Sequence, residues 1–234
     1  MADVDLLGLL SGRAGVVSSA ADDRRKRIDG ITLGVVSDVD DPQSLGRVKV
    51  RLPWLSTQAE SAWARVAVPW AGPQRGTYFV PEVDDEVVVA FRHGDVRHPY
   101  VLGYLWSATA RPPEANPRLG RRGLTSKSGH KLVFDDSAGS EQVAITSKNG
   151  TTVTLDDSGS GKVTVANRAK TVKIELDFAQ GAISITSNEG SITLSAPTGK
   201  VAVNAASFEV KTTGPLQLQS SATVSVQGSL VKIN

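Results

Sequence analysis

Residues 153–165 read VTLDDSGSGKVTV, and they hold two copies of the unit that decides the fold of the second half of the chain. Each unit is an apolar-x-apolar triplet, with a middle residue that is often polar, followed by polar turn residues. Twelve such triplets follow Lys131: Leu132-Val133-Phe134, Val143-Ala144-Ile145, Val153-Thr154-Leu155, Val163-Thr164-Val165, Val172-Lys173-Ile174, Ile183-Ser184-Ile185, Ile192-Thr193-Leu194, Val201-Ala202-Val203, Phe208-Glu209-Val210, Leu216-Gln217-Leu218, Val224-Ser225-Val226 and Val231-Lys232-Ile233. Because side chains alternate between the faces of a strand, the pattern predicts strands with one dry and one wet face.

The dry face of these strands is too small to form a core within one chain. Each triplet supplies two or three aliphatic side chains, and the only rings beyond residue 131 are Phe134, Phe178 and Phe208. Three chains wound about one axis would pair their strands with each other and bring these side chains together. We therefore predict an intertwined trimeric (triple-stranded) β-helix over residues 131–234, about 55 Å long at ~4.8 Å per strand. A monomeric calcium-binding parallel β-helix is the rival, but its Gly-Gly-x-Gly-x-Asp repeat is missing.

The sequence pattern before residue 131 predicts a different architecture. Nine of the twelve aromatic residues, including all four tryptophans, lie between Trp54 and Trp106. Five short β segments separated by Gly, Pro and Asp turns predict a small closed barrel over residues 30–106; they are Ile31–Val36, Arg47–Leu52, Ala64–Pro69, Glu86–Phe91 and Tyr100–Leu105. We expect the tryptophans to serve in the barrel core and in contacts with a partner. The Pro- and Gly-rich residues 107–130 predict a linker, and residues 1–29 an N-terminal arm.

The barrel segment resembles a known domain. The motifs are Leu45-Gly46-Arg47-Val48-Lys49-Val50-Arg51-Leu52-Pro53-Trp54, Ala62-Trp63-Ala64-Arg65, Pro69-Trp70-Ala71-Gly72, Gly76-Thr77-Tyr78-Phe79-Val80-Pro81, His93-Gly94-Asp95 and His98-Pro99-Tyr100-Val101-Leu102-Gly103. They resemble the oligonucleotide/oligosaccharide-binding (OB) domain of phage baseplate assembly protein V, of contractile-tail spikes and of VgrG proteins. The residues that carry this resemblance as structural positions are Gly46, Arg47, Val48, Pro53, Trp54, Trp63, Arg65, Pro69, Gly76, Pro81, Gly94 and Gly103.

The resemblance implies a homotrimeric, cell-puncturing central spike at the baseplate of a contractile phage tail or a tail-like injection system, with its needle facing the target cell envelope. VgrG proteins carry a large hub region before the OB domain. Only about thirty residues precede it here, so we expect a separate hub protein that residues 1–29 contact. We also expect a PAAR-type tip protein to dock on the last residues of the repeat, namely Leu230, Val231, Lys232, Ile233 and Asn234.

Composition bears on the location and chemistry of the protein. The short apolar stretch at residues 6–10 precedes the basic run Arg24 to Arg27, the reverse of a signal peptide, so we expect the protein in the cytoplasm during assembly and then in the baseplate. The absence of cysteine excludes a disulfide framework and a thiolate metal site. With 26 basic and 24 acidic residues the chain has a net charge of +2, and we expect no nucleic-acid partner. An OB nucleic-acid module that stacks bases on Trp54, Trp63, Trp70 and Trp106 is the alternative.

No motif predicts catalysis, a cofactor or a metal. The pairs Asp135-Asp136 and Asp156-Asp157 precede Ser and Gly and predict turns. His93 and His98 lack a third metal ligand at a suitable spacing. Some phage spikes carry a His-x-His iron site at the apex of the needle, but no histidine follows His130 here. The acidic cluster Glu82, Asp84, Asp85 and Glu86 predicts a solvated loop or a hub contact. We therefore expect a structural protein without enzymatic activity; the alternative is a polysaccharide-active β-helix enzyme.

Overall fold

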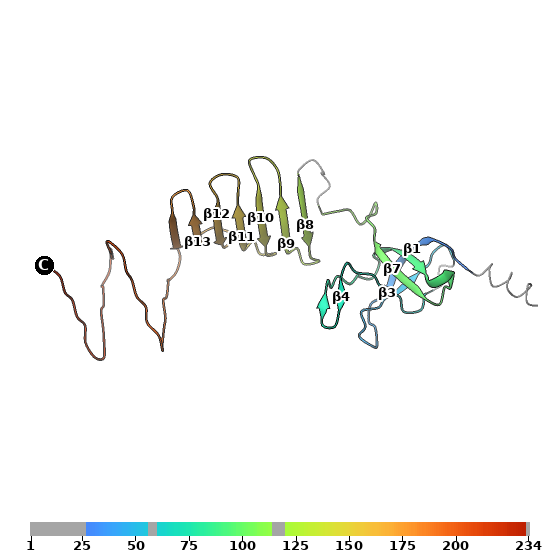
Figure 1. Ribbon diagram of the computed structural model, residues 1–234, viewed down its shortest axis with the longest axis horizontal. Helices are drawn as coiled ribbons and strands as arrows, with labels where there is room; N and C mark the ends of the chain where they lie inside the picture. The colour runs from blue at the N-terminus through green and yellow to red at the C-terminus, as the bar shows by residue number, and fades with distance from the viewer. Residues whose placement is uncertain (1–26, 56–59, 114–119, 233–234) are drawn as a thin grey trace, which may run out of the picture.

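A computed structural model describes residues 27–55, 60–113 and 120–232 of the chain. Two sheets follow one another along it, a five-stranded sheet near the N-terminus and a seven-stranded sheet after residue 120 (Figure 1). The only helix in these residues is the short 3-10 turn η1 (Arg92–Gly94). The described chain is thus all-β, as predicted, and it contains no helix long and apolar enough to cross a membrane.

The first sheet has the strand order of an OB barrel. Its strands are β1 (Ile31–Asp38), β2 (Lys49–Arg51), β3 (Arg65–Val66), β6 (Glu86–Phe91) and β7 (Pro99–Tyr104), in the spatial order β2-β1-β6-β7-β3. β3 and β7 pair in parallel, and the other neighbours pair antiparallel. A small hairpin of β4 (Ala71–Gly72) and β5 (Arg75–Gly76) projects from the connection between β3 and β6. The predicted barrel strands are therefore confirmed.

Hydrogen bonds between the two outer strands close the barrel. The N–H of Val48 donates to the carbonyl of Ala64 over 3.0 Å, and the N–H of Ala64 donates to the carbonyl of Val48 over 2.7 Å. The N–H of Ser61 adds a third bond, to the carbonyl of Val50 over 2.8 Å. Because the outer strands pair with each other, the barrel leaves little unpaired strand edge.

Valine predominates in the barrel core. Along β6 every second side chain points inward, which buries Val87, Val89 and Phe91. They pack against further buried aliphatic residues from the other strands, namely Val36, Val48, Val50, Leu52, Ala64 and Val101. The expectation of tryptophans in the core was wrong: Trp54, Trp70 and Trp106 are largely exposed and Trp63 is half-buried. Five short strands enclose a narrow interior, which valine side chains fill and indole rings would overfill.

The second sheet is an antiparallel meander in which each strand pairs with its neighbour in the chain. Its strands are β8 (Arg121–Thr125), β9 (Lys131–Asp135), β10 (Gln142–Thr146), β11 (Thr152–Asp156), β12 (Lys162–Ala166), β13 (Val172–Asp177) and β14 (Ala182–Ser187). Six of the twelve predicted triplets lie in β9 to β14. They pair in register except in β13, where residues 174–176 rather than 172–174 align with the triplets of β12 and β14. We refer to these seven strands as the shaft sheet.

The shaft sheet differs from the prediction in two respects. Its first strand, β8, lies inside residues 107–130, the predicted linker, and pairs with β9. Its strands also pair within one chain, whereas we expected them to pair with strands of other copies. Short turns with glycines in the left-handed region, such as Gly139 (φ 77°) and Gly161 (φ 86°), allow each strand to fold back on the one before it.

Residues 189–232 hold the other triplets and form no strand in this structure. They run back and forth in extended conformation beyond β14 (Figure 1). The last hydrogen bond to the shaft sheet runs from the N–H of Asn188 to the carbonyl of Thr171, over 2.9 Å. Beyond it, the hydrogen bonds among the described residues are local, such as that from the Gly199 N–H to the carbonyl of Ala196. We call residues 189–232 the terminal segment.

Candidate assembly surfaces

An ion pair between Arg47 and Asp41 stabilises the loop between β1 and β2. The OB-like motif begins in this loop, at Leu45. Arg47 donates from Nη2 to Oδ1 of Asp41 over 2.7 Å and from Nε to Oδ2 over 3.0 Å. The backbone N–H groups of Gln43, Leu45 and Arg47 also donate to this carboxylate. The guanidinium of Arg47 and these N–H groups hold the pKa of Asp41 well below its usual range. The sequence indicated the importance of Arg47, but not its partner.

Trp63 lies beside this ion pair. The guanidinium carbon of Arg47 is 5.9 Å from the centre of the Trp63 ring, and Nζ of Lys49 is 5.2 Å from it. Both cations are thus within range of a cation-π contact. Between this loop and the β4–β5 hairpin lies an open hollow of about 1230 Å³, whose walls include Trp63, Trp70, Tyr78 and Phe79. An aromatic wall of this kind is typical of a protein-protein contact.

Two glycines of the motif region allow close backbone approach. A Cβ atom on Gly34 in β1 would lie 2.3 Å from Cγ1 of Val50. Gly94 has a φ of 78° and is buried beneath the start of the described chain, where the N–H of Ile28 donates to its carbonyl over 2.9 Å. Residues 27–29 therefore attach to the barrel; the rest of the predicted arm, residues 1–26, lies outside the described residues.

The other motif residues are spread over the barrel and do not converge on one site. Val48 and Pro81 are buried, whereas Pro53, Trp54, Arg65 and Pro69 are exposed. Gly46 and Gly76 have positive φ angles, Gly46 in the loop between β1 and β2 and Gly76 in β5, and Gly103 lies within β7. Pro53 and Trp54 line a second, shallow hollow of about 450 Å³ with Leu33 and Glu86. The motif thus contains both folding positions and exposed contact positions.

The acidic loop after the β4–β5 hairpin contacts the shaft sheet. Glu82 forms an ion pair with Lys127, which lies in the turn between β8 and β9. Asp84 pairs with Arg51 of β2 through Oδ1 and Nη2 over 2.9 Å, and the carboxylate of Asp85 accepts from the N–H of Glu82 over 2.8 Å. This loop is therefore tied to both sheets. The link to Lys127 was not predictable, because no local pattern joins residues so far apart in the chain.

The histidines and paired aspartates have local roles. His93 lies in the left-handed region with a φ of 52°, and Nε2 of His98 is 3.9 Å from Asp95. Asp135 is almost fully buried; the Ser137 hydroxyl and the Arg121 guanidinium lower its pKa to about 2. Asp156 accepts from the N–H and hydroxyl of Ser158, as a turn residue does. Within the described residues, His, Asp and Glu form no group of three that could hold a metal ion.

The shaft sheet has one apolar face that the described chain leaves uncovered. The cross-strand registers align Val143 with Leu155 and Val165 with Ile174. The same face continues from β8 to β14 through Leu124, Leu132, Phe134, Ile145, Val153, Val163, Leu176, Ile183 and Ile185. Ile145 is 53% exposed and Ile183 is 74% exposed. The opposite face carries Thr154, Thr164 and other polar residues, so the predicted alternation of dry and wet faces is confirmed in this sheet.

The terminal segment has uncovered apolar side chains as well as unpaired backbone. Exposed aliphatic and aromatic residues recur along it: Ile192, Leu194, Val201, Val203, Phe208, Val210, Leu216, Leu218, Val224, Val226, Leu230 and Val231. Of the predicted tip-docking residues, Leu230, Val231 and Lys232 are exposed, and Ile233 and Asn234 lie outside the described residues.

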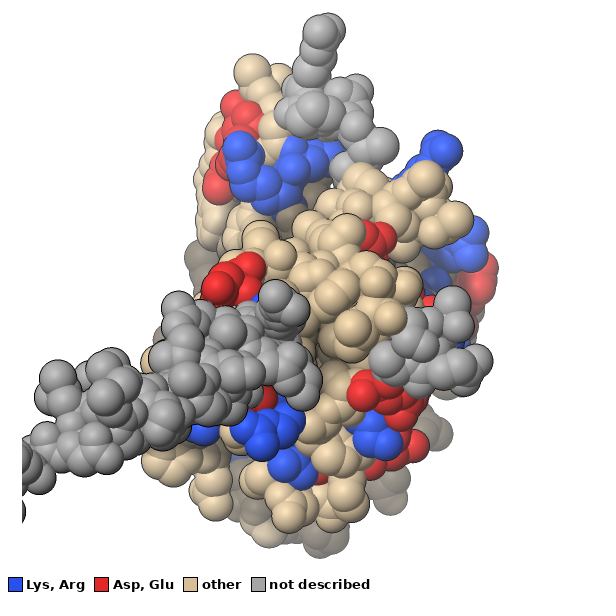
Figure 2. Space-filling model, turned by 90° about the vertical axis from the view of Figure 1, so that its right-hand side faces the viewer, with Lys and Arg blue, Asp and Glu red and all other residues tan. Residues whose placement is uncertain are grey.

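Charged side chains at the barrel end do not form a surface of one sign. Figure 2 looks along the molecule onto this end, and basic and acidic groups lie next to one another around it. The ion pairs Arg97–Asp95, at 2.7 Å, and Arg51–Asp84 are examples. The broad uncovered surfaces of the described chain are therefore the apolar face of the shaft sheet and the terminal segment, rather than a basic groove.

Comparisons with known proteins point to one kind of assembly. Residues 32–106 match the family model of the type VI secretion system/phage-baseplate injector OB domain. The chain is 38% identical over 112 residues to the type VI secretion system spike protein VgrG3 of Vibrio cholerae, which covers 44% of this chain and 11% of that protein. It is 31% identical over 140 residues to the spike protein VgrG2a of Pseudomonas aeruginosa, covering 54% of this chain and 17% of the relative.

A longer match reaches into the shaft sheet. The chain is 32% identical over 174 residues to a Vibrio cholerae protein named actin cross-linking toxin VgrG1, covering 70% of this chain and 16% of the relative. The chain thus spans less than a fifth of the length of each of these relatives.

Proposed function

Since the chain belongs, through residues 32–106, to the family of type VI secretion and phage-baseplate spike proteins, we propose that three copies of it form the central spike of a contractile tail or injection apparatus. The observation that carries the proposal is the uncovered apolar face of the shaft sheet, which is continuous from β8 to β14. An exposed apolar surface of this size marks a site of association. The terminal segment supports it, since its extended backbone finds partners only in other chains.

The dimensions of the shaft sheet suit three copies. A five-residue strand such as β11 is about 17 Å long, so each sheet is a ribbon of roughly that width. Three ribbons arranged as a triangle would each lie about 5 Å from the common axis, which is half of the ~10 Å spacing at which two sheets pack face to face. The side chains of Val143, Leu155 and Val163 would then meet at the axis without a channel. Four ribbons would lie about 8 Å from the axis and leave it unfilled.

In the terminal segment the three copies would have to pair differently. Its runs are extended, but consecutive runs do not form hairpins with each other. We propose that they pair with the runs of the other two copies, which is the intertwined β-helix that the repeat predicts. The spike would then have two parts: a shaft of three self-paired sheets, and an intertwined needle formed by residues 189–232.

The barrel would carry the spike on the rest of the apparatus. We propose that a separate hub protein contacts the arm and the exposed aromatic residues of the barrel, among them Trp70, which is 57% exposed. A PAAR-type tip protein would bind at the opposite end, on residues 230–234 of three copies, where Leu230 and Val231 are exposed. The role of the chain is then mechanical: it transmits the force of contraction to the target cell envelope without catalysing a reaction.

The mass of the purified protein tests this proposal. Light scattering should give about three times the 24.6 kDa of one chain. A particle with the mass of one chain would contradict the spike. Co-purification with candidate tip proteins, with and without residues 230–234, then tests the tip contact separately.

A further inference from the structure

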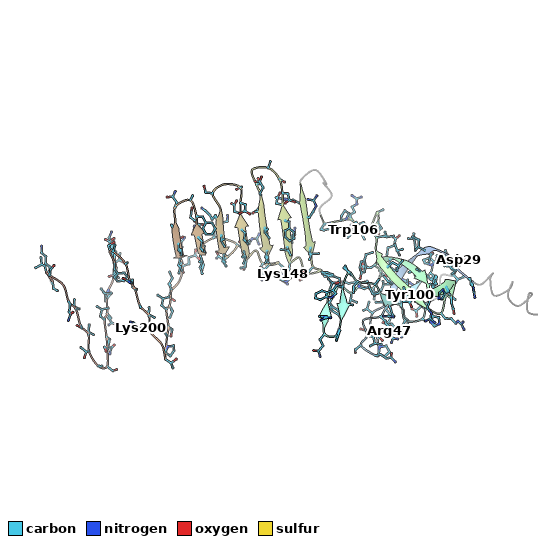
Figure 3. All side chains as sticks on the ribbon, viewed as in Figure 1. Asp29, Arg47, Tyr100, Trp106, Lys148 and Lys200 are labelled. Carbon is cyan, nitrogen blue, oxygen red and sulfur yellow. The ribbon has the colours of Figure 1, made fainter. Side chains whose placement is uncertain are left out.

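The two edges of the shaft sheet carry opposite charge. The turns 126–130, 147–151 and 167–171 lie on one edge, and they contain Lys127, Lys148, Arg168 and Lys170 but no Asp or Glu. The turns 136–141, 157–161 and 178–181 lie on the other edge, and they contain Asp136, Glu141 and Asp157 but no Lys or Arg. We call them the basic edge and the acidic edge. In Figure 1 the acidic edge of the sheet is drawn upward, and Figure 3 labels Lys148 on the lower edge.

Some charges at the edges are used within the chain. Lys127 pairs with Glu82 of the barrel, and Asp136 pairs with Arg122 of β8 over 3.1 Å. The strand ends at the acidic edge add two further ion pairs, Arg121–Asp135 at 2.7 Å and Lys162–Asp177 at 3.1 Å.

The remaining edge charges have no ion pair within the described chain: Lys148, Arg168 and Lys170 on the basic edge, and Glu141 and Asp157 on the acidic edge. The two groups cannot neutralise each other within one chain. A strand of five residues separates them by about 17 Å, which is beyond the ~8 Å screening length at physiological salt.

We propose that the basic edge of one copy docks on the acidic edge of the next copy around the axis. This inference rests on the trimer proposed above. When ribbons with one apolar face are arranged around a rotation axis with that face inward, each copy must present its first edge to the second edge of its neighbour. Unlike edges therefore meet at all three corners, and the charge segregation turns each corner into an attractive contact.

The charged turns also interdigitate along the axis. Successive turns on one edge are two strands apart along the axis, which is about 10 Å. The turns of the opposite edge lie midway between them, about 5 Å from each. At each corner, Asp157 of one copy would therefore lie at a height between Lys148 and Arg168 of the next. Glu141 would lie between Lys127 and Lys148. The side chain of Arg168 already reaches along the basic edge, since a Cβ atom on Gly150 would lie 2.8 Å from its Cγ.

This arrangement selects the orientation of the copies. A copy inverted along the axis, with its apolar face still inward, would present its acidic edge to an acidic edge and its basic edge to a basic edge. The apolar side chains alone discriminate weakly against such an inversion, because the contacting faces consist almost entirely of aliphatic side chains. The edge charges add repulsion to the inverted arrangement, which is the usual role of charge in choosing between similar packings.

Charge reversal with a compensating reversal tests the proposal. In the full-length protein, Lys148→Glu and Asp157→Lys should each lower the midpoint of thermal dissociation by about 5 °C at low salt, since each places like charges at three corners. In the double variant Lys148→Glu with Asp157→Lys the two new charges attract each other but face Glu141 and Arg168, so its loss should be no larger than that of one single variant and well below the sum of the two. In about 1 M NaCl the differences should shrink, because screening removes the contribution of exposed pairs. Arg92→Glu, an equal change of charge at an exposed barrel position, is the control and should have no effect.

The possible outcomes test the edge contact and the trimer separately. A trimer whose midpoint is unchanged by both single reversals would overturn the edge contact and leave the spike proposal standing. Losses that persist at high salt and that add in full in the double variant would overturn it as well, because they would indicate local damage to the turns. A wild-type protein with the mass of one chain would overturn the trimer itself.

Discussion

Gly34 and Val50 pack backbone against side chain across the pair β1–β2, with the position of a Cβ atom on residue 34 only 2.3 Å from Cγ1 of Val50. Val50 is fully buried in the barrel core, so its side chain has no free space into which to move. We expect Gly34→Ala to lower the free energy of unfolding of the barrel by about 2 kcal/mol, the usual cost of overpacking a core. Tryptophan fluorescence during urea unfolding reports on the barrel, because all four tryptophans lie there.

A matched substitution separates this overpacking from a general effect of replacing glycine. Gly103 lies in the same barrel, and a Cβ atom there would meet no atom within 4 Å. Gly103→Ala should therefore change the stability little. Adding Val50→Ala to Gly34→Ala should relieve the clash, and a double variant that is worse than the sum of the two single changes would contradict the packing argument.

The carboxylate of Asp41 organises the loop between β1 and β2, because it accepts from three backbone N–H groups as well as from Arg47. Asp41→Ala should speed hydrogen exchange at the amides of Gln43 and Leu45 about tenfold, since the loop loses its acceptor. Asp40→Ala is the control at the exposed neighbouring position. Equal exchange in the two variants would show that the ion pair does not order the loop.

The buried carboxylate of Asp135 makes the shaft sheet sensitive to acid. Its pKa is lowered to about 2 by the Ser137 hydroxyl and the Arg121 guanidinium, whereas an unfolded aspartate titrates near ~3.9. A lowered folded pKa means that Asp135 stabilises the sheet fully above about pH 4, and that this stabilisation is lost as the pH falls towards 2. The urea midpoint followed by circular dichroism should fall over this range.

A variant that cannot titrate identifies the group responsible. Asp135→Asn should be less stable near neutral pH and should lose the part of the pH dependence that Asp135 contributes. Asp136→Asn changes the exposed neighbouring carboxylate and should leave most of that dependence in place. If the midpoint of Asp135→Asn followed pH as the wild type does, another group would be responsible.

Substitution by aspartate should dissociate the assembly on one face of β11 and leave it intact on the other. Leu155 points to the apolar face and Thr154 to the polar face, one residue apart. Leu155→Asp places a carboxylate on the face that three copies would cover in the proposed trimer. Burial of an unpaired charge there would cost several kcal/mol per copy and should reduce the mass seen by light scattering to that of one chain. Thr154→Asp should remain a trimer. A trimer in both variants would mean that this face is not the contact between copies.

The terminal segment should be protected from hydrogen exchange in the assembled protein. Its runs form no strand in the single chain, so protection there requires hydrogen bonds to other copies. We expect amides between Val201 and Val226 to exchange on the order of a hundred times more slowly than in an unstructured peptide. Dilution until the trimer dissociates should remove the protection. Fast exchange in a protein with the mass of three chains would exclude the intertwined needle.

Alternation predicted the strands well because it depends only on the two-residue period of an extended backbone. The triplet Val153-Thr154-Leu155 sends its outer members to one face wherever the strand finds its partner. The partner itself was harder to predict. Whether Val163 pairs with Leu155 of its own chain or with a strand of another copy depends on the turn between them, and Gly161 with its left-handed φ favours the hairpin.

The barrel shows where composition misleads. Tryptophan is the largest apolar side chain, so its concentration between Trp54 and Trp106 suggested a core of rings, but the radius of a five-stranded barrel admits valine instead. Contacts between residues far apart in the chain also could not be predicted from the sequence. Glu82 and Lys127 are both ordinary surface residues in the sequence, and only the folded chain brings them together.

The shaft sheet pairs within one chain and the terminal segment does not, which separates the folding of the single chain from the assembly of the proposed trimer. The hairpins of residues 121–187 join near neighbours in sequence, so they can form quickly in a single newly made chain. If the runs beyond Asn188 pair with those of other copies, as proposed, their ordering depends on encounter and therefore on concentration. Scarce chains would then wait with the hairpins formed and the last forty or so residues open to proteases. Synthesis of many copies from one messenger RNA would shorten that interval.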